Sequence, residues 1–229
     1  MNFFKELAII FFDILDKYIH QKKIVTYLKR NIVSLDNFID IGSHKGTYTD
    51  LISKNFSTGK IYMFEPQKEI FNYIKKKYKF KKKIKIFNKA VSNENKLKKI
   101  YINKHDLTSS LTKLDKKNSY LNIKAKLFGG NINNMIKNEH LIKCVKLNNV
   151  IKKNNIKNVD LLKIDTEGHE LQVLQGLGKY ISKIKYILIE FHNSNIYINY
   201  SSKNVHNYLV KNNFELKKKI QISIYNVGG

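Results

Sequence analysis

Short apolar runs alternate with amphipathic segments along most of the chain. The runs with the length and composition of strands cover residues 37–41, 60–64, 83–88, 98–103, 144–147, 159–164, 185–191, 214–218 and 221–227. Helical spacing of apolar residues follows several of them, at residues 46–54, in the stretch up to residue 78, and at residues 168–178 and 202–212. Strands that alternate with helices of this length indicate an α/β fold: a single doubly wound, mostly parallel sheet with helices on both faces.

The first 35 residues have a different pattern, with helical spacing at residues 2–20 and 22–33. We therefore expect an N-terminal helical extension over residues 1–35, followed by one domain over residues 36–229. The apolar face of the first helix is expected to pack on the domain. The alternative is that it lies on a membrane surface, because its apolar stretch is too short to span a bilayer. Within the domain, residues 104–142 have weak periodicity and many Asn residues, which predicts a loop-rich insertion.

The charge balance changes the range of partners to consider. The chain carries 43 basic and 18 acidic residues, a formal net charge of +25, but Arg30 is its only arginine. Such a charge favours contact with an anionic membrane or another polyanion, whereas the lack of arginine forks argues against sequence-specific reading of nucleic acid. Lys, Asn and Ile are also what an A/T-rich coding sequence produces, so a purely compositional origin of the charge stays open.

The cysteine content excludes two kinds of stabilisation. Cys144 is the only cysteine, which rules out an intramolecular disulfide and a zinc site built on several thiolates. This composition fits a reducing compartment, and we expect a cytoplasmic protein. The oligomeric state is left open by the sequence.

A glycine loop follows the first predicted strand of the domain. Its glycines, Gly42 and Gly46, have G-x-x-x-G spacing, which differs from the dinucleotide fingerprint, and no Gly-Lys-Ser/Thr marks a P-loop. Asp40, just before the loop, suits a cationic amino-acid group better than a pyrophosphate. Glu65 ends the second strand, where a carboxylate can accept both hydroxyls of a ribose. Together these features predict a site for S-adenosylmethionine, which has an ammonium group, a carboxylate and a ribose but no phosphate.

Ionisable side chains gather at the ends of two later strands. Asp165 and Glu167 follow the run at 159–164, and Glu190 and His192 end the next strand. We expect Asp165 and His192 to act as the base that removes a proton from the acceptor, with Glu167 or Glu190 orienting it. A rival hypothesis is that Asp165, Glu190 and His192 bind a divalent cation, Mg²⁺ or Mn²⁺. A third is that Glu190 and His192 pair structurally with Lys163.

The same cluster also allows a plain structural interpretation. Residues 163–170 would then form a solvated turn in which Thr166 is the N-cap of the next helix. In either case His169 and Glu170 lie one turn into that helix, and we expect them on its solvated face.

Six motifs in a fixed order give the chain a family resemblance over about residues 36–195. They are Phe38 to Gly46, Phe64-Glu65-Pro66, Lys89-Ala90-Val91-Ser92, Ser109-Ser110-Leu111, Leu162 to Glu170 and Ile189-Glu190-Phe191-His192. This ordered set resembles the signature of FkbM-type methyltransferases. The resemblance implies a class I Rossmann-like methyltransferase fold and S-adenosylmethionine-dependent O-methylation, commonly of sugar or natural-product hydroxyls.

The resemblance also implies positions for the cofactor. Asp40, Gly42 and Gly46 would line its methionine end, Glu65 its ribose, and residues 90–92 its adenine edge. The expected cofactor-binding residues are Asp40, Gly42, Ser43, Gly46, Glu65, Pro66, Ala90, Val91 and Ser92.

The chain departs from the family pattern at two places. The family usually has Ala-Asn at Ser43-His44, and Leu-Asp where this chain has Leu147-Asn148. Contacts from the first pair, and any role of an acid at the second, are therefore in doubt.

Three functions remain open at this stage. The first is a methyltransferase for a sugar, glycan or other small-molecule hydroxyl. The second is an RNA or protein methyltransferase that uses the basic surface, and the third is a module that binds cofactor without turnover. Cytosine-C5 methylation is excluded because Cys144 follows Lys143 rather than proline, and adenine-N6 methylation because residues 165–168 contain no proline.

Overall fold

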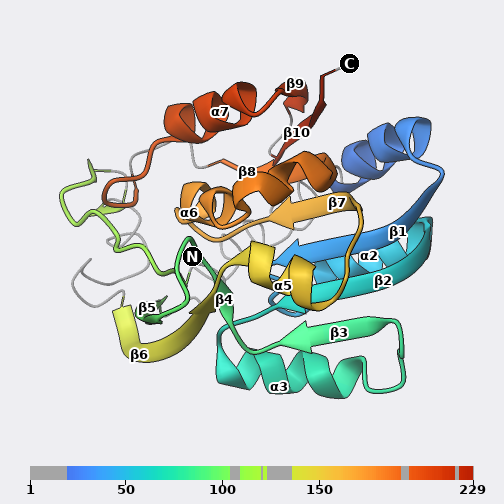
Figure 1. The fold of residues 1–229 in the computed structure, drawn as a ribbon. Coiled ribbons are helices and arrows are strands. Elements are labelled where there is room, and N and C mark those ends of the chain that lie inside the picture. The colour runs from blue at the N-terminus through green and yellow to red at the C-terminus, as the bar shows by residue number, and fades with distance from the viewer. Residues whose placement is uncertain are drawn as a thin grey trace, which may run out of the picture.

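A seven-stranded sheet organises the chain in the computed structural model, which describes residues 20–103, 109–119, 121–122, 136–191, 196–219 and 222–228 (Figure 1). The strand order is β3-β2-β1-β7-β8-β10-β9. The strands are β1 (Ser34–Ile41), β2 (Ser57–Phe64), β3 (Ile84–Phe87), β7 (Val159–Ile164), β8 (Ile184–Glu190), β9 (Phe214–Lys219) and β10 (Ile222–Val227). Strand β10 alone runs opposite to the other six strands of this sheet, and it pairs antiparallel with both β8 and β9. The predicted doubly wound, mostly parallel sheet is therefore confirmed.

Both faces of the central strands are buried, which explains why their sequences are nearly continuous apolar runs. In β7 all six residues are buried. Alternate side chains serve two cores: Ile39 and Leu162 pack on one face, and Phe38 and Leu161 on the other. Figure 1 shows α5 and α6 in front of the sheet and α2 behind it.

The helices fall into two groups according to these cores. The first core includes buried residues of α5 (Leu147–Lys153), α6 (Glu170–Gln175), the 3-10 helix η3 (Gly178–Lys183) and α7 (Ser202–Lys211). The second core includes buried residues of the helix over residues 20–31, of α2 (Thr47–Asn55) and of α3 (Lys68–Lys77). The sheet is therefore covered on both sides, as the alternation of strands and helices predicts.

The part of the N-terminal extension that the structure describes packs on the domain. Ile24 and Leu28 of the helix over residues 20–31 are fully buried in the same core as Phe38. The first predicted helix, at residues 2–20, lies almost wholly outside the described residues. Among the helices described, none is long and apolar enough to cross a membrane.

A three-stranded sheet beside the main one corrects two expectations. It consists of β4 (Ala90–Val91), β6 (Ile136–Val145) and β5 (Leu97–Asn103), in that order. Strand β6 begins inside the region predicted to be a loop. The sequence pattern missed it because residues 138–141 are exposed, and antiparallel pairing with β5 holds the strand in place rather than an apolar face. The strand expected at 144–147 ends at Val145, and Leu147 instead begins α5, a helix that the sequence pattern did not predict.

The glycine loop after β1 is fixed by backbone contacts with both neighbouring strands. The Gly42 amide donates to the Phe64 carbonyl at 3.1 Å, and the Asp165 amide donates to the Ile41 carbonyl at 3.2 Å. Gly42 has φ +70°, and a Cβ there would lie 1.8 Å from the Asp165 carbonyl oxygen. Only glycine therefore lets β1 and β7 end so close together.

Gly178 offers a matched control for this contact. It also has a positive φ, +51°, but the nearest atom to a Cβ there is 3.8 Å away. We expect Gly178→Ala to lower the free energy of unfolding by about 1–2 kcal/mol, the cost of the left-handed conformation. Gly42→Ala should lower it by more than about 3 kcal/mol, because the clash with backbone adds to that cost. Urea unfolding measures both, and equal losses would show that contact with Asp165 is not what requires glycine at position 42.

Candidate active site

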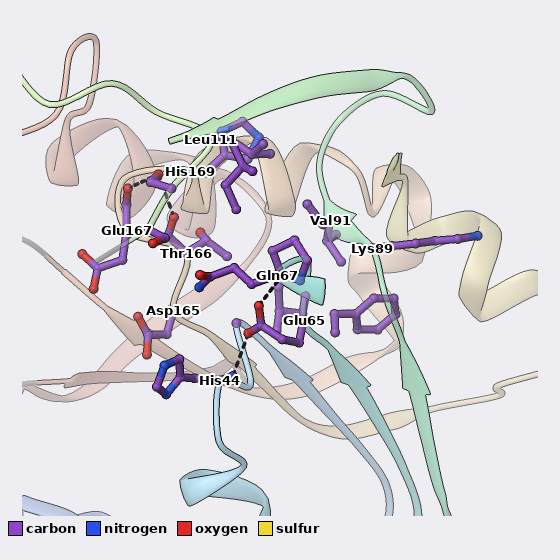
Figure 2. A pocket seen from close by; sticks show the side chains of 18 residues that line it. His44, Glu65, Gln67, Lys89, Val91, Leu111, Asp165, Thr166, Glu167 and His169 are labelled. Carbon is purple, nitrogen blue, oxygen red and sulfur yellow. Dashed lines mark hydrogen bonds between the residues drawn. The ribbon is translucent and has the colours of Figure 1, made fainter. Parts of the chain in front are cut away.

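A cleft opens where the carboxyl ends of β1, β2 and β7 meet. The chain runs from β1 outward to β2 and β3 and later returns to the other side of β1 as β7, so this is the switch point at which open α/β sheets bind ligands. Residues near β4 and at 109–111 complete the wall, and the cleft holds about 680 Å³ of space including its open mouth. Figure 2 shows Glu65 in the middle, the side chains of Asp165 and Glu167 pointing to one side, and Val91 and Lys89 on the opposite side.

Glu65 is the best-positioned of the predicted ligands. It is 3% exposed and lines the cleft. Its Oε2 accepts from the His44 amide at 3.0 Å and its Oε1 from the Gln67 amide at 2.7 Å, so backbone fixes both oxygens. Burial raises the pKa of Glu65 to about 7, although these two hydrogen bonds act in the opposite direction. Each carboxylate oxygen still has acceptor capacity for a ligand hydroxyl.

One end of the cleft has an apolar wall suited to a flat ring. Ala90 and Val91 of β4 line the cleft together with Ile100 of β5, and Pro66, which follows Glu65 in the chain, lines it too. Ser92, also predicted to contact the cofactor, does not line the cleft: its hydroxyl lies 2.9 Å from Nε2 of His169.

Fewer residues of the glycine loop line the cleft than the sequence predicted. Gly42 and His44 line the cleft, but Asp40, Ser43 and Gly46 do not. Asp40 is fully buried, and its carboxylate accepts from the Thr49 hydroxyl at 2.7 Å.

Ser43 and Gly46 also form hydrogen bonds that stabilise the loop. The Ser43 hydroxyl donates to the Phe64 carbonyl at 3.2 Å. Gly46, with φ +81°, precedes α2, and its carbonyl accepts from the buried Tyr78 hydroxyl. The structure therefore places Asp40, Ser43 and Gly46 behind the cleft wall.

Lys163 forms ion pairs with one residue of β1 and one residue that follows β7. Its side chain is 2% exposed, and its Nζ lies 3.4 Å from Asp40 and 3.2 Å from Asp165. The ammonium also donates to the Gly42 carbonyl at 2.8 Å. Burial alone would lower the pKa of Lys163, but the carboxylates of Asp165 and Asp40 outweigh it and hold the pKa above its ordinary value. The lysine is therefore a buried cation, and its neighbours keep a fixed geometry.

Glu167 is held on the cleft wall by contacts to its backbone and its side chain. The Ser110 hydroxyl donates to its carbonyl, and the Tyr197 hydroxyl donates to its Oε2. Its φ of 55° lies in the left-handed region, which is uncommon for a residue other than glycine. Burial raises the pKa of Glu167 well above its ordinary value, the nearby charge of Asp165 raises it further, and the Tyr197 hydrogen bond counteracts them.

The expectation that His169 and Glu170 lie on a solvated helix face is wrong. His169 is 6% exposed and Glu170 fully buried. The helix begins only at Glu170, with His169 at the N-cap position, so Thr166 is not its N-cap. Instead the Oε1 of Glu170 reaches back and accepts from the amides of Thr166 and Gly168 and from the Thr166 hydroxyl. The buried carboxylate thus supplies the acceptor that the donors of this turn need.

His169 connects this turn to two other segments. Its Nε2 lies 2.9 Å from the Ser92 hydroxyl and its Nδ1 3.4 Å from the Thr112 hydroxyl. The Thr112 hydroxyl donates to the Gly168 carbonyl, so its oxygen is the atom available to accept from Nδ1–H. Burial lowers the pKa of His169 to about 3, which keeps the imidazole neutral.

Of the two residues predicted at the end of β8, the structure describes Glu190 but not His192. Strands β7 and β8 are parallel with Ile164 opposite Ile189, so Glu190 ends its strand beside Asp165. His192 lies outside the described residues, and the base pair of Asp165 and His192 stays a prediction. Among the residues that are described, no group of three or more His, Cys, Asp or Glu side chains could hold a metal ion, and the divalent-cation hypothesis has no support.

Two tyrosines near the carboxylates were not predicted to belong to the site. The ring of Tyr48, on the first turn of α2, lies 5.0 Å from the Lys163 ammonium, and Tyr197 contacts Glu167. The position of Tyr48 just after the glycine loop is a signal that could have identified it. Tyr197 comes from a segment that reaches the site through a bridge with Leu114, and the local sequence carries no sign of that pairing.

Solved structures with a similar fold include several methyltransferases. A methyltransferase FkbM from Methylobacillus flagellatus KT matches with a TM-score of 0.53 at 15% identity, over 84% of this chain and 43% of that one. An rRNA methylase from Streptococcus thermophilus matches with a TM-score of 0.49 at 7% identity, over 90% and 95%. TrmK from M. capricolum, solved with S-adenosyl-homocysteine, matches with a TM-score of 0.46 at 15% identity, over 88% and 66%. This chain thus spans less than half the length of the Methylobacillus protein.

The sequence comparison is more specific than the fold. No curated protein sequence matches the chain significantly. The methyltransferase FkbM domain, however, matches residues 40–216, which include the glycine loop, Glu65 and the cluster at Asp165. The match covers most of the chain and all of the described cleft, and the chain therefore belongs to the FkbM methyltransferase family.

Proposed function

We propose that this protein transfers the methyl group of S-adenosylmethionine to a hydroxyl oxygen of a sugar, glycan or other small molecule. The observation that carries the proposal is Glu65, a buried carboxylate at the end of β2 whose oxygens are both fixed by backbone amides. The order of groups across the cleft fits the cofactor. Carboxylates at one end suit its ammonium and sulfonium, Glu65 in the middle suits the ribose, and the wall around Val91 suits the adenine.

The bound cofactor would supply an electrophilic methyl group, and the chain's own residues would do the rest. Acceptor alignment falls to the side chains beside the methionine end, among them Asp165, whose carboxylate Lys163 holds in place. An alcohol must lose its proton as it attacks, and a carboxylate or imidazole at this strand edge can take it. We assign that role to Asp165 with His192, and the orientation of the acceptor to Glu167 or Glu190.

The cofactor assignment is tested by calorimetry with S-adenosylhomocysteine. We expect binding, and we expect Glu65→Gln to weaken it by more than about tenfold, because a charged acceptor of two hydroxyl donors becomes a neutral amide. Glu215→Gln is the control: it removes the same charge from an exposed pair with Lys217 on β9, at the far end of the sheet. Absence of binding at millimolar ligand would contradict the proposal.

The base assignment is tested by turnover. Asp165→Asn and His192→Ala should each lower kcat by roughly a hundredfold or more, the range over which general bases act. The measurement is transfer of a radiolabelled methyl group to an acceptor found in a panel of sugars and hydroxylated metabolites. Unaltered turnover in both variants would remove the assignment, and full activity after exhaustive chelation would remove a divalent cation from the mechanism.

A groove beside the cleft favours a second candidate function, methylation of an anionic acceptor such as RNA. The groove runs between β3 and the β5–β6 ribbon and shares residues 66, 67, 89 and 100 with the cleft. Lys68, Lys89 and Lys143 line it together with apolar side chains, whereas no Asp or Glu among the described residues does. None of these three lysines forms an ion pair with a described carboxylate, so the groove carries uncompensated positive charge.

This candidate predicts salt-dependent binding of a labelled 20-nucleotide oligouridylate. Lys68→Gln with Lys143→Gln should reduce the slope of log K against log salt by about 1.4, since each phosphate contact in a single strand contributes about 0.7. The matched control is Lys152→Gln with Lys211→Gln, two exposed lysines on α5 and α7. Equal slopes in the two double variants would assign the binding to overall charge rather than to the groove, and a neutral sugar acceptor should show no such dependence.

A further inference from the structure

A basic groove lies between the helix over residues 20–31 and β9, and it shares no residue with the cleft. It holds about 880 Å³ of space including its open mouth. The residues that line it, which we call the basic face, are Lys22, Lys23, Thr26, Tyr27, Arg30 and Lys218. We propose that the basic face attaches the protein to an anionic membrane surface, with lipid phosphates as its ligands. This inference goes beyond the proposed function, because it requires neither a cofactor nor methyl transfer.

The spacing of residues along the helix places its cations on one side. Lys22, Thr26 and Arg30 recur at every fourth position and therefore follow one side of the helix. Ile24 and Leu28 lie on the opposite side, and both are fully buried in the core beneath the helix. Packing of the apolar side on the sheet thus fixes the basic side toward solvent.

Strand β9 adds a cation from a distant part of the sequence. Lys218 is paired with Ile224 of β10, and Ile224 belongs to the same core as Ile24 and Leu28. Because paired residues of adjacent strands point to the same face of a sheet, Lys218 lies on the face that the helix covers. Figure 1 shows this helix, in blue, on the side of the molecule where β9 and β10 lie.

The positive charge of the basic face is not neutralised by acidic side chains. Among the described residues, no Asp or Glu lines the groove, and neither Arg30 nor any of the three lysines forms an ion pair. Other surface lysines do have such partners, for example Lys77 with Asp50. The basic face therefore offers a group of cations that an anionic partner can neutralise.

The surrounding sequence favours a membrane over a nucleic acid as that partner. Residues 1–19, which lie outside the described residues, contain an apolar run at positions 7–12 and continue directly into the helix. Val33, just beyond the helix, is 97% exposed. Apolar side chains beside a cluster of cations are typical of segments that bind the surface of anionic bilayers. Specific reading of nucleic acid depends more on arginine, of which Arg30 is the only one.

The position of the basic face leaves the cleft accessible. The helix covers one face of the sheet, whereas the cleft opens at the carboxyl ends of β1, β2 and β7. Attachment through the basic face and binding of a ligand in the cleft therefore do not exclude each other.

Vesicle flotation with the whole chain tests the proposal. We expect binding to vesicles of equal parts phosphatidylcholine and phosphatidylglycerol, and none to pure phosphatidylcholine. Binding should weaken as the salt concentration rises, because salt screens exposed charges. The combined variant Lys22→Gln, Lys23→Gln, Lys218→Gln should bind roughly a hundredfold more weakly, since each basic residue near an anionic surface contributes about fivefold.

The matched control removes three exposed lysines from the opposite face of the sheet. It combines Lys152→Gln on α5 with Lys203→Gln and Lys211→Gln on α7, two helices whose buried residues belong to the other core. Its net charge equals that of the first variant, but we expect its vesicle binding to stay close to that of the unchanged chain. Equal losses in the two triple variants would assign the attraction to overall charge and overturn the proposal.

A fluorescent probe identifies the face that contacts the bilayer. The chain has no tryptophan, so one introduced at a single position is the only source of indole emission. Thr26→Trp places it in the groove, and Val210→Trp places it on α7, at a site that is 51% exposed. We expect anionic vesicles to shift the emission of the first variant to shorter wavelength and to leave the second unchanged. Equal shifts in the two variants, or no shift in either, would contradict the proposal.

A labelled oligouridylate separates the two classes of anionic partner. If it binds through the basic face while anionic vesicles do not bind, the partner is a nucleic acid and the membrane proposal is overturned. Binding to neutral vesicles as strong as to anionic ones would also overturn it, because charge would then play no part. Should the triple variant of the basic face not fold, as judged by its thermal transition, the tryptophan pair decides. None of these outcomes depends on whether the chain transfers a methyl group.

Discussion

The ion-paired ammonium of Lys163 is the interaction on which the rest of the site depends. It lies between Asp40 at the end of β1 and Asp165 after β7, and it donates to the Gly42 carbonyl in the loop between them. Removing one member of such a buried pair typically costs roughly 3–5 kcal/mol, because a desolvated charge is left without its partner. The glycine loop, whose close approach to Asp165 leaves no space for a Cβ, is therefore fixed both by backbone geometry and by charge.

This arrangement separates the charges that build the cleft from those that face a ligand. Asp40 is fully enclosed, and its contacts with Thr49 and Lys163 hold the loop rather than a substrate. Asp165 receives the same ammonium but remains on the cleft wall. The Oε1 of Glu170 accepts hydrogen bonds from three donors of the preceding turn. Neighbouring acids thus have different roles: those that are fully buried hold the structure, and those on the cleft wall can face a ligand.

The sequence was sufficient to predict the sheet and the region of the cleft, because both follow from local pattern. Apolar runs marked the strands, and the carboxyl ends of parallel strands must meet at one edge, so Glu65 and Asp165 could be expected near each other before any contact was known. The expectations failed where pairing between distant segments decides the outcome. Strand β6 forms because β5 pairs with it, despite its exposed polar residues, and Tyr197 reaches Glu167 only because its segment bridges to Leu114.

Burial of His169 and Glu170 was missed for a related reason. Helical spacing places them on a polar face, but the helix starts later than the spacing suggests, and the preceding turn needs an acceptor for its amide groups. A charged residue in the first turn of a helix can satisfy such donors or point to solvent, and local sequence does not distinguish the two. The choice depends on what covers the turn, here the segment with Thr112 and the strand end with Ser92.

The chain as a whole is strongly positive, whereas the sheet edge at the cleft is rich in acidic residues. A net charge of +25 repels a positively charged ligand at long range, yet six of the 18 acidic residues gather at this one sheet edge: Asp40, Glu65, Asp165, Glu167, Glu170 and Glu190. At physiological ionic strength the field of distant lysines is screened beyond about 8 Å, whereas partly buried carboxylates at contact distance are screened much less. Glu65, Asp165 and Glu167 line the cleft, so a ligand there meets these nearby acids more strongly than it meets the distant surface lysines. The surface lysines and the acids of the cleft can therefore act on a ligand at different distances, with Lys163 already paired to Asp40 and Asp165 within the wall.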